Sequence, residues 1–355
     1  MERVSHGWLV SPAFDLGLLV GPALVAVVVA LALPAGAPAP PWVYAALVLG
    51  VDVAHVYASL YRTYLDPEER RRRPRLYAGA PRAALVICGA LCAISPGLFW
   101  TAMAYLAVYH FVRQQVGFLS LYRLREGLPT RSRDARVERA LVYGLTLWPV
   151  LWWHANLPRG FAWFMEGDFL SLALAPLVVP AGMAVVALGV AHLYSRLRSR
   201  RWAPGRDLWV LTTGLVWSSG IVWTDSDLAF TATNIVAHGL PYLALVGWVC
   251  GRRWAVDGRG AAAPGWFTPR GAWLYFAPLL LLAFVEEGLW DRLVWHDNAW
   301  LFGEAAAGGP PAWLAAAAVP LLAVPQVTHY LLDGYIWKLG PTNPGLRALL
   351  EPVSR

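Results

Sequence analysis

Four of the eight histidines lie inside long apolar stretches, each with a second polar side chain three or four residues away. The groups formed in this way are Asp52 with His55, His110 with Arg113 and Gln114, Asn234 with His238, and His329 with Asp333. Because three to four residues make about one helical turn, the members of each group lie on one face of a helix. Imidazole and carboxylate groups are donors that many metal ions prefer. The spacing therefore predicts a metal-binding or catalytic role for these four groups of residues.

The composition predicts that these groups lie within a membrane. The chain has 355 residues, of which 58% are hydrophobic and 14% are charged, and its mean hydropathy is +0.47. A helix needs about 20 predominantly apolar residues to cross roughly 30 Å of hydrocarbon. Ionisable side chains inside such helices are costly, so they usually face a bundle interior or a wet cavity and mark a functional site. We therefore expect an all-α, polytopic integral membrane protein.

The apolar segments predict about ten membrane-spanning helices. Their approximate limits are 15–34, 41–65, 82–95, 98–122, 140–157, 170–196, 208–224, 227–250, 272–291 and 312–337. No charged loop is long enough to bury a core of its own, so we expect one transmembrane helical domain over residues 1–355 and no soluble domain. The first apolar segment lacks a small-residue cleavage site, and we interpret it as a retained helix.

The distribution of the +7 formal charge predicts how the helices are oriented. Arginines cluster between alternate apolar segments, at 70–75, 123–139, 196–206 and 252–270, whereas the opposite loops carry mainly Asp and Glu. By the positive-inside rule, both termini are cytoplasmic in a plasma (inner) membrane. No nucleic-acid-binding motif accompanies the basic charge. The expected partners are therefore membrane lipids and an apolar or amphipathic small molecule, and not nucleic acid.

The depth of the four histidines predicts that they meet. His55, His110, His238 and His329 lie about 11 to 17 residues from the outer ends of their expected spans. At about 1.5 Å per residue, these depths differ by less than about 10 Å, which helix tilt can absorb. Helical bundles build metal sites from inward-facing residues of neighbouring helices. The sequence therefore predicts one shared site in which these four histidines are metal ligands.

The polar neighbours of the histidines have expected roles in the same site. Asp52 and Asp333 complete the ligand set or take part in catalysis. Gln114 and Asn234 are expected to fix the orientation of the imidazoles around the cofactor. Arg113 is expected to take part in catalysis by holding a carboxylate or phosphate of the substrate, because a guanidinium binds such groups through two parallel hydrogen bonds.

The remaining histidines are placed outside the expected ligand set. His192 lies near the inner end of its expected span, where a role as a fifth ligand and an interfacial role are both open. His154 and His296 fall near the outer surface, and His6 lies in the N-terminal segment.

The ligand types narrow the class of protein. Imidazole with carboxylate favours iron, with zinc as an alternative and haem less favoured, and the lack of clustered cysteines argues against an iron–sulfur cluster. The zinc-protease motif H-E-x-x-H and the clustered histidines of membrane desaturases are both absent. We expect a metal-dependent membrane oxidoreductase, a non-haem iron oxygenase or oxidase acting on a lipid or isoprenoid. The alternatives are a metal-ion or proton-coupled transporter, a zinc-dependent lipid hydrolase and a haem-b electron-transfer protein.

Overall fold

The computed structural model describes most of the chain as helix. The residues that it describes are 7–34, 36, 39–129, 131–199, 202–256, 269–304, 309–340, 343, 346 and 350. Helices account for 81% of the chain, and no strand occurs among the described residues. The expected all-helical fold class is confirmed.

Within the described residues, seven helical segments are long and apolar enough to cross a membrane. They are Pro12–Ala32, Pro41–Arg62, Pro74–Ile94, Ala175–Ser199, Asp227–Arg252, Arg270–Trp295 and Ala312–Ile336. Each coincides with one of the ten expected spans, as a multi-pass membrane protein requires. The other three expected spans fall on helices that carry more polar side chains. The number of ten spans and the cytoplasmic termini stay predictions.

Contacts between residues divide the chain into two compact units. Unit 1 consists of Met1–Ala39, Ala104–Pro241 and Arg347–Arg355, and unit 2 consists of Pro40–Met103 and Tyr242–Leu346. Two long helices, α7 (Pro96–Arg125) and α11 (Asp227–Val256), contribute residues to both units. The expectation of a single transmembrane domain stays a prediction.

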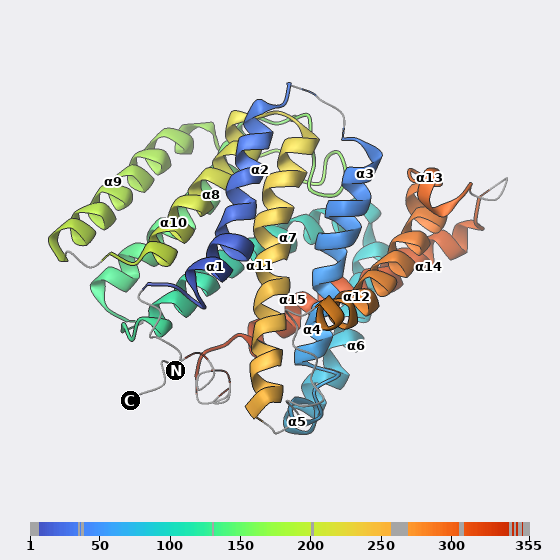
Figure 1. Ribbon diagram of the computed structural model, residues 1–355. Coiled ribbons are helices and arrows are strands. Elements are labelled where there is room, and N and C mark those ends of the chain that lie inside the picture. The colour runs from blue at the N-terminus through green and yellow to red at the C-terminus, as the bar shows by residue number, and fades with distance from the viewer. Residues whose placement is uncertain are drawn as a thin grey trace. The chain divides into compact units, whose positions relative to one another are not determined.

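Unit 1 contains the first helices of the chain and most of its middle. Besides its parts of α7 and α11, it comprises α1 (Pro12–Phe14), η1 (Asp15–Val20), α2 (Gly21–Ala32), α8 (Arg133–Ala155), α9 (Ala175–Ser199), α10 (Pro204–Trp217) and η3 (Ser218–Trp223), where η denotes a π-helical segment. Helices α8 and α9 run side by side (Figure 1). Glycines permit this approach, because a Cβ atom on Gly144 would lie only 2.8 Å from Val185 and one on Gly182 only 2.9 Å from Trp148.

Unit 2 combines a helix pair from the first third of the chain with the last helices. It comprises α3 (Pro41–Val43), η2 (Tyr44–Val53), α4 (Ala54–Arg62), α5 (Pro67–Arg72), α6 (Pro74–Ile94), α12 (Pro269–Trp290), η4 (Asp291–Trp295), α13 (Ala299–Phe302), α14 (Ala312–Leu322) and α15 (Val324–Ile336). Helix α15 packs against α4 and α6, and α12 packs against η2 and α4. These contacts position the polar residues of the unit.

Helix α6 is longer than the expected span 82–95, because it already begins at Pro74. Arg75 and Arg82 make its first half polar, so hydropathy alone assigned that half to a loop. A second difference concerns α14 and α15, which together fill one expected span. The helix is interrupted after Leu322 and resumes with Pro325 in the first turn of α15, a position where proline is tolerated because its missing N–H has no helical partner.

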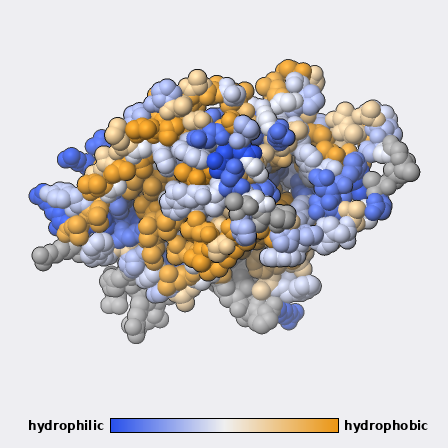
Figure 2. Space-filling view, turned by 90° about the horizontal axis from the view of Figure 1, so that it is seen from above, coloured by the Kyte–Doolittle hydropathy of each residue, from blue (hydrophilic) through white to orange (hydrophobic). Residues whose placement is uncertain are grey.

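Large apolar side chains lie on the outer faces of the helices. In Figure 2, apolar residues cover much of the visible surface. Helix α9 shows this most strongly, because none of the residues in its most apolar stretch is buried. Val179, Val186 and Val190 are each about two-thirds exposed. Such a continuous apolar face is unusual for a protein surface in water and suits a helix that faces lipid.

Candidate functional site

Two histidines of unit 2 lie ring against ring. His55 comes from α4 and His329 from α15, and their exposed fractions are 0% and 1%. The ring centroids are 4.9 Å apart and the ring planes cross at 81°. Because α15 packs directly on α4, this close approach follows from the helix packing of the unit. Two rings at this separation can each turn one nitrogen toward a common point.

An aspartate flanks each of these imidazoles. Oδ1 of Asp52 lies 3.6 Å from Nδ1 of His55, and Oδ2 of Asp333 lies 3.8 Å from Nε2 of His329. The helical spacings of three and four residues therefore place carboxylate and imidazole together, as the sequence indicates. Unit 2 thus contains a row of four potential metal donors in the order Asp52, His55, His329 and Asp333, which we call the unit 2 row.

Tyr242 joins the unit 2 row, and the sequence interpretation missed it. Its hydroxyl donates a 2.7 Å hydrogen bond to Oδ1 of Asp333. Its ring stands edge-on to both imidazoles, with centroids 5.5 Å from that of His55 and 5.1 Å from that of His329. The bond holds one carboxylate oxygen of Asp333 and leaves the other toward His329. A signal was available, because Tyr242 follows His238 by one helical turn.

The other two expected ligands form a second pair in unit 1. His110 of α7 and His238 of α11 have ring centroids 5.0 Å apart at an interplanar angle of 76°. They are 6% and 1% exposed. Phe111 stacks on the His238 ring at 3.6 Å, and Trp163 meets Phe111 edge-on at 5.1 Å. Aromatic side chains therefore cover one side of this pair. The expectation that all four histidines share one metal stays a prediction.

The side-chain amides of Gln114 and Asn234 donate hydrogen bonds to main-chain oxygens of unit 1. Nε2 of Gln114 donates to the main-chain oxygen of His238 at 2.7 Å, which ties α7 to α11 beside the histidine pair. Nδ2 of Asn234 donates to the main-chain oxygen of Phe230 at 3.2 Å. Oε1 of Gln114 and Oδ1 of Asn234 are buried, and neither finds a hydrogen-bond partner in the described part of the chain. Their expected part in orienting imidazoles stays a prediction.

Arg113 lies on an exposed part of unit 1. Its guanidinium donates a hydrogen bond to the hydroxyl of Tyr143 on α8. The Arg113 side chain is exposed. One side of the guanidinium is therefore anchored while the residue remains accessible. The expected role of Arg113 in binding an anionic group of the substrate stays a prediction.

His154, expected near the outer surface of the membrane, is buried among the side chains of unit 1, and its depth in a membrane stays a prediction. It is only 6% exposed. Its Nδ1 is 2.7 Å from the main-chain oxygen of Val150, and its Nε2 is 2.8 Å from the hydroxyl of Tyr105. Both ring nitrogens are therefore engaged by the protein, which is typical of a structural histidine. His296 is exposed at the end of η4 in a left-handed conformation, and His6 lies outside the described residues.

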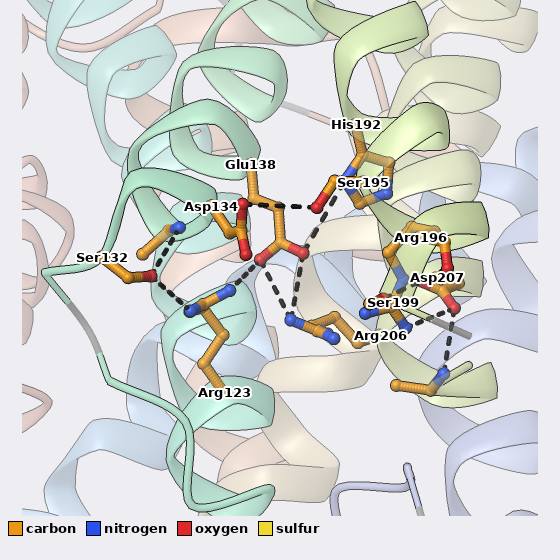
Figure 3. Close-up of polar contacts among 12 residues, drawn as sticks. Arg123, Ser132, Asp134, Glu138, His192, Ser195, Arg196, Ser199, Arg206 and Asp207 are labelled. Carbon is orange, nitrogen blue, oxygen red and sulfur yellow. Dashed lines mark hydrogen bonds and ion pairs between the residues drawn. The ribbon is translucent and has the colours of Figure 1, made fainter. Parts of the chain in front are cut away.

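His192, whose role the sequence leaves open, joins a buried ionic network in unit 1 (Figure 3). Its Nδ1 lies 3.7 Å from Oε1 of Glu138. Glu138 is 3% exposed and accepts hydrogen bonds from both Arg123 and Arg206. Arg206 also contacts Glu126, with Nε and Oε1 3.0 Å apart. The network connects the end of α7 with the first turns of α8 and α10 and the last turns of α9.

Burial and neighbouring charges have opposing effects on the pKa values of Glu126 and Arg206 in this network. Burial raises the pKa of Glu126 above its ordinary value of 4.5, and the neighbouring Arg206 opposes that rise. Burial also lowers the pKa of the Arg206 guanidinium, and Glu138 and Glu126 oppose that effect. Because Arg206 is 1% exposed, a buried cation stands between two carboxylates. The network, which we call the Glu138 clamp, is therefore structural: removing one of its charged members leaves the charge of a buried partner uncompensated.

A further carboxylate pair lies in α12 of unit 2. Glu286 and Glu287 are 7% and 8% exposed. Oε2 of Glu286 accepts a 2.5 Å hydrogen bond from the hydroxyl of Tyr57, and Glu287 accepts one from the hydroxyl of Tyr44. Ionisable groups of unit 2 therefore extend beyond the unit 2 row.

The donor set of the unit 2 row fits a divalent transition metal. Two imidazoles and two carboxylates are ligands that suit iron, zinc and manganese. The row lies in helices that are apolar enough to cross a membrane, and its two histidines are buried from solvent. Tyr242 supplies the outer hydrogen bond that commonly orients a ligating carboxylate. The unit 2 row therefore offers donor types that suit such a metal, in two His–Asp pairs whose imidazole rings lie against each other.

Comparisons with known proteins give no family for this chain. No protein-family model matches the sequence, and neither the curated proteins nor the solved structures yield a match.

Proposed function

We propose that this protein is a membrane-embedded metalloenzyme, a non-haem iron oxygenase or oxidase that acts on a lipid or isoprenoid. The observation that supports the proposal is the unit 2 row, in which the pairs Asp52–His55 and His329–Asp333 meet through their imidazoles in helices that are apolar enough to cross a membrane. Buried ionisable groups in such helices are costly and are kept where they serve a site.

The chemistry of the donors favours a redox metal with open positions. Two histidines and one carboxylate are the ligand set of many non-haem iron oxygenases, and a bound ferrous ion would supply O₂ activation. In this assignment, His55, His329 and one aspartate bind the metal. Tyr242 holds Asp333 in place through its 2.7 Å bond. The second aspartate remains to accept or return a proton.

The surroundings of the row favour an apolar substrate. The row lies in segments whose outer faces are apolar, so a lipid or isoprenoid could reach the site from the hydrocarbon without crossing water. The proposed location is a plasma membrane, and the proposed partners are membrane lipids. Arg113 in unit 1, exposed and anchored on Tyr143, is the residue that we assign to a carboxylate or phosphate of the substrate.

The experiment is metal analysis of the detergent-purified protein, followed by turnover of total membrane lipid with O₂ and mass spectrometry of the products. We expect bound iron, no haem absorption band, and oxygenated or cleaved lipid. His55→Ala and His329→Ala should lose metal and product together. His296→Asn is the matched control, because His296 is exposed and asparagine tolerates its left-handed conformation. Protein without metal, or metal bound equally by the variants and wild type, would overturn the proposal.

A metal-ion or proton-coupled transporter is the second candidate. The observation that favours it is the extent of the ionisable groups in unit 2, from Glu286 and Glu287 to Asp52 and the unit 2 row. The interruption between α14 and α15 in one span is also a feature of many transporters. Ion flux across proteoliposomes without any altered lipid would favour this candidate over the enzyme.

A further inference from the structure

A small cavity lies within unit 1. Its apolar walls come from η1, α2 and α11, and its polar wall is formed by Gln115 of α7 with Thr212 and Thr213 of α10. The cavity has a volume of about 10 Å³, which is room for about one water molecule. It is therefore too small for a lipid or other organic ligand.

The hydroxyl of Thr212 has an unusual environment for a threonine in a helix. Buried helical threonines usually bond to a main-chain oxygen of the preceding turn, as Thr213 bonds to Trp209 at 2.8 Å and Thr146 to Val142 at 3.0 Å. Thr212 is 4% exposed, yet its Oγ1 has no hydrogen-bond partner among the described residues. Burying an unpaired hydroxyl is costly, so a partner is expected.

Gln115 supplies the second polar group of the cavity. It is 4% exposed, and its Oε1 accepts a 3.0 Å hydrogen bond from Thr213. Its main-chain oxygen accepts a 3.0 Å bond from the indole of Trp209. Gln115 and Thr212 thus both line the cavity, and the bond from Thr213 holds the Gln115 carboxamide in its wall. A water molecule placed there meets both a hydroxyl and an amide, and buried waters typically make about three such bonds.

We propose that this cavity is a binding site for one ordered water molecule, which bridges Thr212 of α10 and Gln115 of α7. The water satisfies the Thr212 hydroxyl and joins two helices inside the unit. Because α7 also carries His110 and Gln114, the bridge supports the segment that positions the unit 1 histidine pair. The proposal is independent of any metal and of the proposed enzymatic activity.

The test compares substitutions that keep or remove the hydroxyl. If water is bound, Thr212→Val removes its anchor and lowers the melting temperature of the purified protein by roughly 2 °C or more, whereas Thr212→Ser keeps the anchor. If the cavity is dry, Thr212→Val removes a buried unpaired hydroxyl and raises the melting temperature. Thr146→Val is the matched control, because that hydroxyl already bonds to the backbone.

A second measurement does not depend on stability. A cryo-electron microscopy or crystal map that resolves ordered water should show one density feature between Thr212 and Gln115, and the Thr212→Val protein should lack it. An empty cavity in the wild-type map, or an unchanged or raised melting temperature in Thr212→Val, would overturn the proposal.

Discussion

The imidazoles of His55 and His329 lie with their ring centroids 4.9 Å apart, although His55 belongs to the first third of the chain and His329 to α15, near its end. Each has an aspartate one helical turn away on its own helix. Two local motifs that the sequence shows separately thus become one row of donors when α15 packs on α4. This relationship is the basis of the first two predictions.

The number of metal ions distinguishes a single four-histidine site from a site made by unit 2 alone. If the four histidines share one metal, as the sequence predicts, His110→Ala and His238→Ala should lose it as completely as His55→Ala does. If the unit 2 row binds metal alone, the first two variants should keep one equivalent. Elemental analysis of each purified variant measures this directly, and His296→Asn is again the control. Full metal content in His55→Ala, His110→Ala and His238→Ala would contradict both versions.

Tyr242 should contribute to metal affinity through Asp333. Tyr242→Phe removes the 2.7 Å hydrogen bond that holds one carboxylate oxygen, and losses of outer hydrogen bonds of this kind typically weaken metal binding by roughly 10–100-fold. Asp333→Asn should weaken it at least as much. The matched control is Tyr275→Phe, since the Tyr275 hydroxyl is also buried but bonds to the main-chain oxygen of Leu243. Equal metal affinities for Tyr242→Phe and Tyr275→Phe would refute the role of Tyr242.

Arg113 should affect turnover without affecting metal content. Its guanidinium is exposed and bonded to Tyr143, so its proposed partner is an anionic group of the substrate. Arg113→Ala should retain the metal and lose turnover of acidic lipids more than of neutral ones. Tyr143→Phe, which removes only the anchor, should give a smaller loss in the same direction. Loss of metal from Arg113→Ala would show that the residue belongs to the metal site.

Glu138 should be critical for the stability of unit 1. It is 3% exposed and accepts hydrogen bonds from Arg123 and Arg206. Its removal therefore takes the carboxylate from buried Arg123 and leaves Arg206 with Glu126 as its acidic neighbour. We expect Glu138→Ala to destabilise the protein by about 3–5 kcal/mol, as the loss of one member of a buried ion pair does. Asp134→Ala is the control on the same helix, because Asp134 is exposed and accepts a 3.3 Å hydrogen bond from the hydroxyl of Ser195. Thermal unfolding in detergent measures both, and similar melting temperatures would contradict the Glu138 clamp.

Glu126 should give stability a defined pH dependence. Its pKa in the folded protein is raised above 4.5 by burial, so the folded state keeps this proton in a pH range where the unfolded state has lost it. Its contribution to stability is therefore largest below that value and decreases as pH rises through the window above it. The melting temperature of wild type minus that of Glu126→Gln should fall as pH rises above the ordinary glutamate value of 4.5. A difference that grows over this range would contradict the raised pKa.

Much of the local structure could be predicted from the sequence. Seven expected spans coincide with helices that can cross a membrane, because a run of apolar residues long enough to span hydrocarbon has few other stable arrangements. The pairing of His55 with Asp52 and of His329 with Asp333 also follows from helical periodicity alone. These features depend only on residues close together in the chain.

The partners of each helix were decided only by the tertiary structure. Periodicity indicates which face of a helix is polar, but not which neighbour that face meets, because lipid and protein interior are both apolar. The sequence therefore could not show that His55 meets His329, that Tyr242 holds Asp333, or that His154 is buried against Tyr105. Packing between helices that are distant in the chain determines these contacts.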